Sequence, residues 1–473
     1  MMEQACTTIL VGKNATVDGS TMIARNDDTF LPLTPQKFVM QPAVNGRQEI
    51  LVSNKNGFKA PLPENGYRTT FTPNADVEKN GVFDESSINE KNVAMSATES
   101  VYGNERALAY DPWVANGLAE DSLQTMVAPF INSAREGVQY LGALIKKYGS
   151  PEGNGVLFSD KDDVWYMEIV TGHHWAATRI PDDAYAIAAN QVAQDYIDFK
   201  QPDNYMWSEG LQEFVNEHHL NPKKNGEFNF RRIFGTDNEK DRHYNTPRVW
   251  YGQKIFTPEV EQSPESSDLP FICRANRLLT VEDLERVLSS HYNETPFDPL
   301  GHGNKEDKQR YRPIALNRTQ NSHVLQIRNN VPEKQAAIMW ICFGIPTFTP
   351  YVPFFTNAND TDPAWSNTPL EYDITSAYWM YRTLSMLTET HYAKFVQENR
   401  DYLTAAREQQ YRLIEKTDLA AKELNGEKLT AFLTKQNYAM SADMKKRTMQ
   451  LISHFITEGL TLSKLTFNMD SNL

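Results

Sequence analysis

A cysteine, an arginine and an aspartate near the start of the chain have the types and spacing of a nucleophilic site. Cys6 opens the strand-like run CTTILV, Arg25 lies near the end of the next such run, TMIARN, and Asp28 follows three residues after Arg25. A thiolate is a strong nucleophile, and a neighbouring guanidinium favours the ionised form of a thiol. These residues define a candidate site with Cys6 as its nucleophile.

The two runs and the loop GKNATVDGS between them predict a β-hairpin. If Thr8 faces Ile23, Cys6 lies directly opposite Arg25, where facing Cβ atoms are about 4.5–5.5 Å apart. The cation then lowers the pKa of the thiol below its reference value of about 8.5. Asp28 follows beyond the expected end of the strand and can fold back toward Cys6.

Cleavage of the bond between Ala5 and Cys6 would add a base to the nucleophile. The new α-amino group has a reference pKa of about 7.7–8.0, so it is partly neutral near neutral pH and can accept the proton of the thiol on the same residue. The small side chain of Ala5 leaves the thiol room to reach its carbonyl carbon. No cysteine–histidine pair is then needed.

A structural interpretation of the same residues stands beside the catalytic one. A lone cysteine near an N-terminus is commonly a small, buried apolar residue. Arg25 and Asp28, within ARNDD, would then belong to a solvated turn. The residues of the hairpin alone leave both interpretations open.

The composition restricts the class of protein. The 473 residues include 61 acidic and 47 basic side chains, and the net charge of −14 disfavours nucleic acid and anionic membranes as partners. No apolar run approaches the ~20 residues of a membrane helix, and MMEQA lacks the features of a signal peptide. Cys6, Cys273 and Cys342 form neither a CxxC pair nor a disulfide framework. We therefore expect a cytoplasmic protein.

Strand and helix patterns divide the chain into two parts. Strand-like runs joined by turn residues dominate residues 1–370, most densely over residues 155–190. The remainder has no proline and carries apolar residues at helical spacing, with Asn425-Gly426 as a break between helices. These patterns predict one large α+β unit with a helical C-terminal section.

Several stretches carry a family resemblance. They are CTTILVGKNATVDGSTMIARND, GHHWAATRIPDD, AIAANQ, YNTPRVW, HYNETPFD and the run from RTQNSHVLQIR through IPTFTPYVPF. In this order they resemble the cysteine dipeptidases of the N-terminal-nucleophile hydrolase superfamily, over roughly residues 6–400. The first stretch is the most specific.

The resemblance implies a fold and a domain organisation. The expected fold is a four-layer αββα sandwich of two antiparallel sheets packed face to face. Residues 1–5 would be a short propeptide, residues 6–370 the catalytic core, and residues 371–473 a helical section that covers an outer layer or an assembly interface. We expect a homo-oligomer.

The resemblance also implies roles for individual residues. Cys6 matches the nucleophile exposed by removal of the propeptide, Arg25 the residue beside the sulfur and Asp28 the partner of the α-amine. Asn190, in AANQ, resembles the side chain that donates to the oxyanion together with a backbone N–H. Arg248, in NTPRVW, resembles the second arginine of the site. Structural alternatives are a turn residue for Asn190 and a surface arginine for Arg248.

Other polar residues are weaker candidates. A dipeptide needs an acidic and a basic partner for its own amino and carboxylate groups, and the segment 231–243 contains aspartates and arginines. Asn245 is a further candidate for the site. The pairs His173-His174 and His218-His219 lack a third ligand at motif spacing, so we expect no metal. The sequence indicates no cofactor.

The expected function is hydrolysis of dipeptides, small-molecule substrates, through a thioester on Cys6. Two alternatives stay open. A non-peptide amide hydrolase acting on penicillin V or conjugated bile salts would use the same mechanism. A catalytically silent, secernin-like interaction protein would result if Cys6 stayed blocked by residues 1–5.

Overall fold

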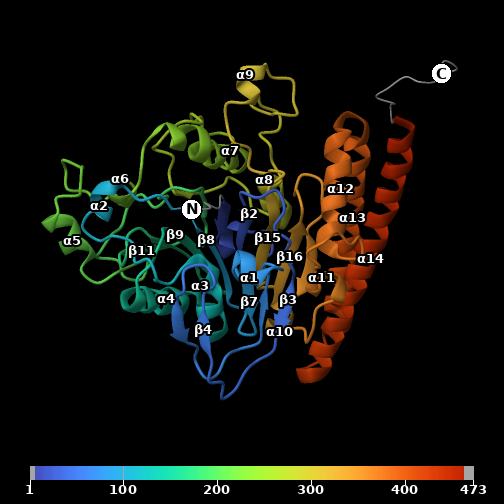
Figure 1. Cartoon of the computed structure of the whole chain (residues 1–473), viewed down its shortest axis with the longest axis horizontal. Helices are drawn as coiled ribbons and strands as arrows, with labels where there is room; N and C mark the ends of the chain where they lie inside the picture. The colour runs from blue at the N-terminus through green and yellow to red at the C-terminus, as the bar shows by residue number, and fades with distance from the viewer. Residues whose placement is uncertain (1–5, 100, 463–473) are drawn as a thin grey trace.

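The computed structural model describes residues 6–99 and 101–462. Two antiparallel sheets lie face to face, and helices cover both outer faces (Figure 1). This four-layer α+β arrangement confirms the fold class that the sequence predicted. Within the described ranges, no helix is long and apolar enough to cross a membrane.

The seven-stranded sheet has the N-terminal hairpin at its centre. In spatial order its strands are β14 (Ile272–Cys273), β12 (Tyr185–Ala188), β1 (Thr7–Val11), β2 (Thr21–Asp28), β15 (Thr319–Ile327), β16 (Ala337–Phe343) and β17 (Val352–Phe355). Neighbours on both sides and layers on both faces bury every residue of β1 and β2.

The eight-stranded sheet packs its inner face on this hairpin. In spatial order its strands are β13 (Tyr205–Trp207), β11 (Trp175–Arg179), β10 (Val164–Ile169), β9 (Asn154–Ser159), β8 (Ala94–Glu99), β7 (Ser86–Asn89), β6 (Thr69–Phe71) and β3 (Val39–Gln41). Strands β8, β9 and β10 lie against β1 and β2. A separate two-stranded hairpin pairs β4 (Ile50–Val52) with β5 (Lys59–Pro61).

Helices form the two outer layers. On the eight-stranded sheet, α3 (Glu120–Val127) packs on β8 and α4 (Ala134–Tyr148) on β9 and β10. The Ser133 side chain caps α4 by accepting the N–H of Glu136, and buried Leu141 and Ile145 lie on its sheet-facing side. On the seven-stranded sheet, α7 (Thr246–Phe256) packs on β12, and α8 (Val281–Leu288) packs on β2 and β15.

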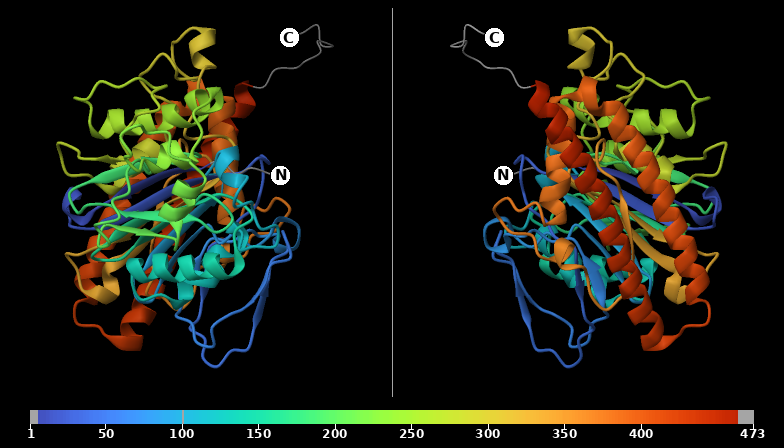
Figure 2. Two further views of the ribbon diagram at one scale, coloured as in Figure 1. Left: turned by 90° about the vertical axis from the view of Figure 1, so that its left-hand side faces the viewer. Right: turned by 90° about the vertical axis from the view of Figure 1, so that its right-hand side faces the viewer.

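The C-terminal section is helical, as predicted. Helices α12 (Ala377–Thr390), α13 (Tyr392–Ala421) and α14 (Gly426–Leu462) run side by side, and α12 and α14 pack on β16 and β17 (Figure 2). The break between α13 and α14 falls at the predicted Asn425-Gly426. Shorter helices lie in the connections: η1 (Lys13–Ala15), α1 (Val77–Asn80), α2 (Glu105–Leu108), η2 (Ala128–Phe130), α5 (Leu211–Glu217), α6 (Phe230–Phe234), η3 (Asp241–Asn245), α9 (Lys305–Lys308), α10 (Glu333–Ala336) and α11 (Pro363–Ser366).

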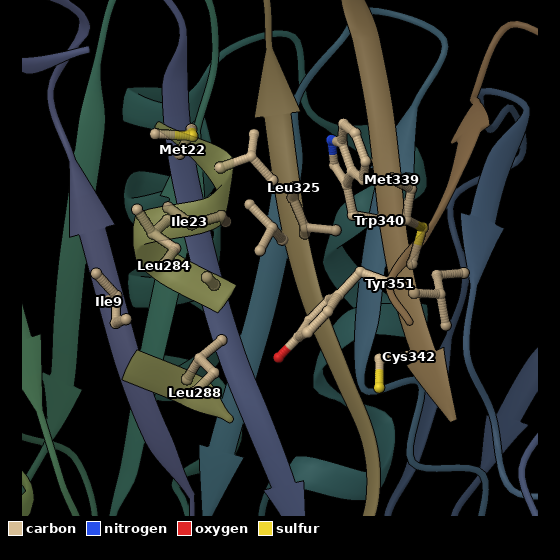
Figure 3. Packing of buried hydrophobic residues seen from close by; sticks show 14 of the residues in the cluster. Ile9, Met22, Ile23, Leu284, Leu288, Leu325, Met339, Trp340, Cys342 and Tyr351 are labelled. Carbon is tan, nitrogen blue, oxygen red and sulfur yellow. The ribbon is translucent and has the colours of Figure 1, made fainter. Parts of the chain in front are cut away.

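A row of apolar side chains fixes the register of β2. Leu325 of β15 pairs with Ile23 of β2 on one side and with Met339 of β16 on the other. Leu284 and Leu288 of α8 lie over the same strands (Figure 3). Full burial of each such side chain contributes about 1.5–3 kcal/mol. A slip of one residue would turn these side chains to the opposite face, so the register is strongly specified.

The register of the N-terminal hairpin differs from the predicted one. Thr8 pairs with Arg25 rather than with Ile23, a shift of two residues. The connection between the strands contains the short helix η1, and the N–H of Val17 donates to the carbonyl of Leu279, so residues 12–20 stay outside the pairing of β1 with β2. Val11 therefore pairs with Met22 rather than with Ser20, and the connection is two residues longer than predicted.

Strand β2 also extends further than predicted. It continues through Asp28, because Thr319 of β15 still pairs with that residue. Arg25, Asn26 and Asp27 are fully buried as well. The interpretation of ARNDD as a solvated turn is therefore wrong. Charged residues are rarely buried in a central strand unless they are paired, and such burial is common at functional sites.

Candidate active site

The thiol of Cys6 lies against the guanidinium of Arg25. The sulfur is 2.9 Å from Nη1, and the two side chains are 1% and 0% exposed. A register shift of two residues keeps both side chains on one face of the hairpin, because side chains alternate along a strand. The predicted contact therefore forms, as a diagonal pair rather than a directly facing one.

The surroundings of Cys6 keep its thiol protonated. Burial raises the pKa of Cys6 to about 11, and the opposing effect of Arg25 is smaller. The charges of Asp27 and Glu85 raise this pKa further. The expectation of a lowered pKa was therefore wrong, because it considered the cation and not the burial. A base is required to remove the thiol proton.

Arg248 connects Cys6 to Asn190. Its Nη1 donates to the carbonyl oxygen of Cys6 at 2.6 Å and to Thr7 Oγ1 at 3.0 Å. Its Nη2 donates to Asn190 Oδ1 at 2.7 Å and to Asn245 Oδ1 at 2.8 Å. Burial is the main cause that lowers the pKa of Arg248, to about 10. Arg248 of helix α7 is thus fully buried, and the alternative of a surface arginine is wrong.

Asn190 follows β12 and presents a donor without a partner. Its Oδ1 is bound by Arg248, while its Nδ2 is buried and has no hydrogen-bond partner among residues 6–99 and 101–462. Glu168 of β10 fixes the turn after it by accepting the N–H of Ala193 at 2.6 Å. A buried donor left unpaired is costly and is available to an oxygen atom of a ligand.

Asp28 lies on the opposite face of β2 from Arg25, which contacts the Cys6 sulfur. Its carboxylate accepts hydrogen bonds from Arg312 and from the hydroxyl of Thr319. The ring of Tyr244 lies 5.3 Å from the guanidinium of Arg312 and 5.1 Å from that of Arg248. The structure thus places Asp28 beside Arg312, a residue to which the sequence analysis assigned no role.

Sequence reasoning also missed the residues that surround Arg25. Glu85, which directly precedes β7, and Ser96 of β8 bind the guanidinium of Arg25. His323 of β15 in turn binds Ser96. The polar run QNSH in β15 was part of the family resemblance but received no role. Its signal is a series of polar residues opening a strand that is otherwise apolar, TQNSHVLQI.

Charged side chains of segment 231–243 form hydrogen bonds and ion pairs with other residues of this protein. Arg231 donates to the carbonyl of Ala193, and Arg232 pairs with Asp237 at 2.9 Å. Asp241 accepts from the Asn245 side chain at 2.7 Å. These contacts stabilise the connection that leads into α7 and Arg248.

His173 and His174 bind other side chains, and the ring of His218 stacks on that of Tyr110 with 3.9 Å between the centroids. His173 Nδ1 lies 2.9 Å from Asp111 Oδ1, and His174 Nδ1 lies 2.9 Å from Ser208 Oγ. In the part of the chain that the structure describes, no three histidine, cysteine, aspartate or glutamate side chains gather as metal ligands would.

Comparison with solved structures gives a distant match. Conjugated bile acid hydrolase from Clostridium perfringens aligns with 72% of this chain and 89% of its own, with a TM-score of 0.27 and 11% sequence identity. So low a TM-score supports no conclusion about a shared fold or function.

Comparison with sequences gives matches along the whole chain. The family model described as peptidase family C69 matches residues 5–405. A probable dipeptidase of Latilactobacillus sakei is 58% identical over 469 residues, which cover 99% of this chain and 98% of that protein. Dipeptidase A of Lactobacillus helveticus is 39% identical, with 99% and 100% covered. The chain therefore belongs to peptidase family C69.

Proposed function

We propose that this protein is a cysteine-type dipeptidase whose nucleophile is Cys6 at the N-terminus of the processed chain. Membership of peptidase family C69 and the dipeptidase names of the relatives support this function. The observation that carries the proposed mechanism is the arrangement around Arg248. One buried guanidinium binds both the Cys6 carbonyl and the Asn190 side chain, whose Nδ2 has no partner among the described residues.

The first step is removal of the thiol proton. Release of residues 1–5, which lie outside the described residues, gives Cys6 a free α-amine. This amine takes the proton, because burial makes the thiol too weak an acid to ionise unaided. The Arg25 guanidinium at 2.9 Å from the sulfur stabilises the resulting thiolate.

The thiolate then attacks the carbonyl carbon of the dipeptide. A sulfur–carbon bond forms and the carbonyl oxygen becomes an oxyanion, which Asn190 Nδ2 stabilises by donating a hydrogen bond. One such donor contributes about 3–4 kcal/mol in the transition state. The carbon–nitrogen bond breaks, and the leaving amine takes the proton from the α-ammonium. Water hydrolyses the thioester with the same amine as base.

Asp28 and Arg248 hold the parts of this site in place. Arg248 fixes the main chain at Cys6 and orients the Asn190 amide so that its donor stays free. Asp28 retains acceptor capacity beyond its bonds to Arg312 and Thr319, since a carboxylate offers about four lone-pair sites. We assign it as the partner of the Cys6 α-ammonium.

Hydrolysis assays with purified protein test this function. A panel of dipeptides is compared with penicillin V and glycine-conjugated bile salts, with Cys6→Ala as the control. The proposal is supported if the wild type hydrolyses dipeptides and Cys6→Ala does not. Turnover of the other amides alone would replace dipeptides by those substrates, and a chain that keeps residues 1–5 and hydrolyses none of these amides would favour a silent protein.

Location and assembly remain predictions. A cytoplasmic protein is consistent with the odd, widely spaced cysteines. Self-association is expected to give a mass in solution that is a multiple of 54.0 kDa, which light scattering after size-exclusion chromatography would measure.

A further inference from the structure

Arg25 has a dense set of buried partners besides the Cys6 sulfur. Its Nε donates to Ser96 Oγ at 2.9 Å, and its Nη2 donates to the Glu85 carbonyl at 2.8 Å. The same Nη2 forms an ion pair with a Glu85 carboxylate oxygen. Both side chains of this pair are at most 1% exposed. Glu85 therefore holds Arg25 through its main chain and its side chain at once.

A chain of hydrogen bonds continues from Ser96. The hydroxyl of Ser96 lies 2.9 Å from His323 Nε2, and His323 Nδ1 lies 3.0 Å from Asn321 Oδ1. Asn321 Nδ2 donates to Gln36 Oε1, and Gln36 Nε2 donates to Asp27 Oδ2. Because Asn321 Oδ1 can only accept, His323 Nδ1 carries the proton and Nε2 accepts from Ser96. Every donor in this chain points away from Arg25.

The histidine in this chain is neutral. Burial, and then the charge of Arg25, hold the pKa of His323 well below its ordinary value. The chain ends at Asp27, which lies two residues after Arg25 and on the same face of β2. The Arg25 guanidinium and the Asp27 carboxylate are thus joined by neutral groups. No member of this hydrogen-bonded series is more than 1% exposed.

We propose that Glu85 is a positioning residue that holds the Arg25 guanidinium against the Cys6 sulfur and opposes ionisation of the thiol, with the chain from Ser96 to Asp27 as its support. The significance of this role for catalysis rests on the proposed function. The inference about the thiol itself rests on the contacts of Arg25 alone.

Glu85 has two effects that can be separated. Its geometry limits the rotation of Arg25, since the Nη2 group is bound on two sides. Its negative charge, where present, stabilises Arg25 but disfavours a second anion at Cys6. Burial, followed by repulsion from Asp27, raises the pKa of Glu85 to about 8. Because the Glu85 carboxylate is paired with Arg25, the Cys6 thiol ionises beside an anion.

Glu85→Gln separates these effects, because an amide keeps an acceptor for Arg25 and removes the charge. The probe is the carbon NMR signal of cysteine Cβ in labelled protein, where the chain has three cysteines and Cys6→Ala assigns the signal of Cys6. In Glu85→Gln the titration of Cys6 is expected to begin about one pH unit lower than in the wild type. Circular dichroism at each pH confirms that the fold persists.

Asp84→Asn is the matched control. Asp84 precedes Glu85, is equally buried and accepts from Thr125 rather than from Arg25. This variant should leave the titration of Cys6 unchanged. An unshifted titration in Glu85→Gln, or an equal shift in Asp84→Asn, would overturn the proposal.

The positioning effect has its own readout. Glu85→Ala should lower kcat for dipeptides at least tenfold below that of Glu85→Gln, with little change in KM, since alanine keeps only the main-chain contact to Arg25 while the amide also keeps a side-chain acceptor. If Glu85→Ala does not fold, Ser96→Ala, which removes the acceptor of Nε, replaces it and should likewise lower kcat. Equal kcat in the wild type and these variants would overturn the positioning role. The NMR titration needs no substrate, so its outcome does not depend on whether the chain is a dipeptidase.

Discussion

The Arg248 guanidinium donates a hydrogen bond to the carbonyl oxygen of Cys6 at 2.6 Å, between residues 242 positions apart in the sequence. The second nitrogen of the same group binds Asn190 Oδ1. One guanidinium therefore sets the position of Cys6, the proposed nucleophile, relative to Asn190, the proposed oxyanion donor. The following predictions test this arrangement and the fold that holds it.

Arg248→Lys should reduce kcat/KM for dipeptides by about 100-fold, because an ammonium group cannot reproduce the planar fork that binds two partners. Arg242→Lys is the control: Arg242 lies nearby in the chain, is half exposed and pairs with Asp237. Its kcat/KM should match that of the wild type. Steady-state kinetics measure both. A kcat/KM of Arg248→Lys within twofold of the wild type would contradict the role of the fork.

Asn190→Ala should lower kcat by about 10²–10³ with little change in KM, because its free Nδ2 would act on the transition state. Asn204→Ala, at an exposed asparagine before β13, should leave kcat unchanged. Kinetics with a dipeptide and a thermal unfolding curve distinguish loss of the donor from loss of the fold. If Asn190→Ala mainly raises KM, Asn190 contributes to substrate binding instead.

Asp84 should make the stability of the wild type decrease as the pH rises. Burial raises the pKa of this carboxyl from 3.8 to about 7, more than the hydrogen bond from Thr125 lowers it. Between these values the folded chain keeps a proton that the unfolded chain has released, so the free energy of unfolding falls with rising pH, by as much as about 4 kcal/mol. Asp84→Asn should lack this contribution. Urea unfolding of both proteins at pH 4 and pH 8 measures the difference. An identical pH dependence would show that the carboxyl is not held in its neutral form.

Gly142→Ala should destabilise the fold by about 1–3 kcal/mol, since a Cβ on this residue of α4 would overlap the buried indole of Trp175. Gly459→Ala provides the comparison within α14, where a Cβ meets nothing within 4 Å. It should stabilise by about 0.5–1 kcal/mol through helix propensity. Denaturant unfolding gives both values. Equal effects of the two substitutions would contradict the close packing of Gly142 against Trp175.

The sequence was sufficient to predict the first hairpin, the strands over residues 155–190, the helical C-terminal section and the contact between Cys6 and Arg25, but not helices such as α4 and α8. Alternating and apolar runs marked the strands, and helical spacing marked the C-terminal section. A register shift of two residues leaves Cys6 and Arg25 on the same face of the hairpin, because side chains alternate along a strand. The register itself was not predictable from the hairpin, because the loop between its strands bonds to Leu279, a residue far along the chain.

The partners of Arg25 and Asp28 could not be predicted for a related reason. Glu85 lies 60 residues from Arg25, and Arg312 lies 284 residues from Asp28. Such contacts depend on how two sheets pack face to face, and nothing in the local sequence distinguishes a buried Glu85 from a solvated one. The family resemblance indicated Asn190 and Arg248, while the free Nδ2 of Asn190 became visible only in the structure.

The most direct test of the central claim is the mass and N-terminal sequence of freshly purified protein, with Cys6→Ala prepared in parallel. The mechanism requires a free α-amine on Cys6, so the wild type should begin at Cys6 and lack residues 1–5. The alanine variant should retain them if the thiol cleaves its own bond. A catalytically active wild type that still begins with MMEQA would contradict the account, because the proposed base would not exist.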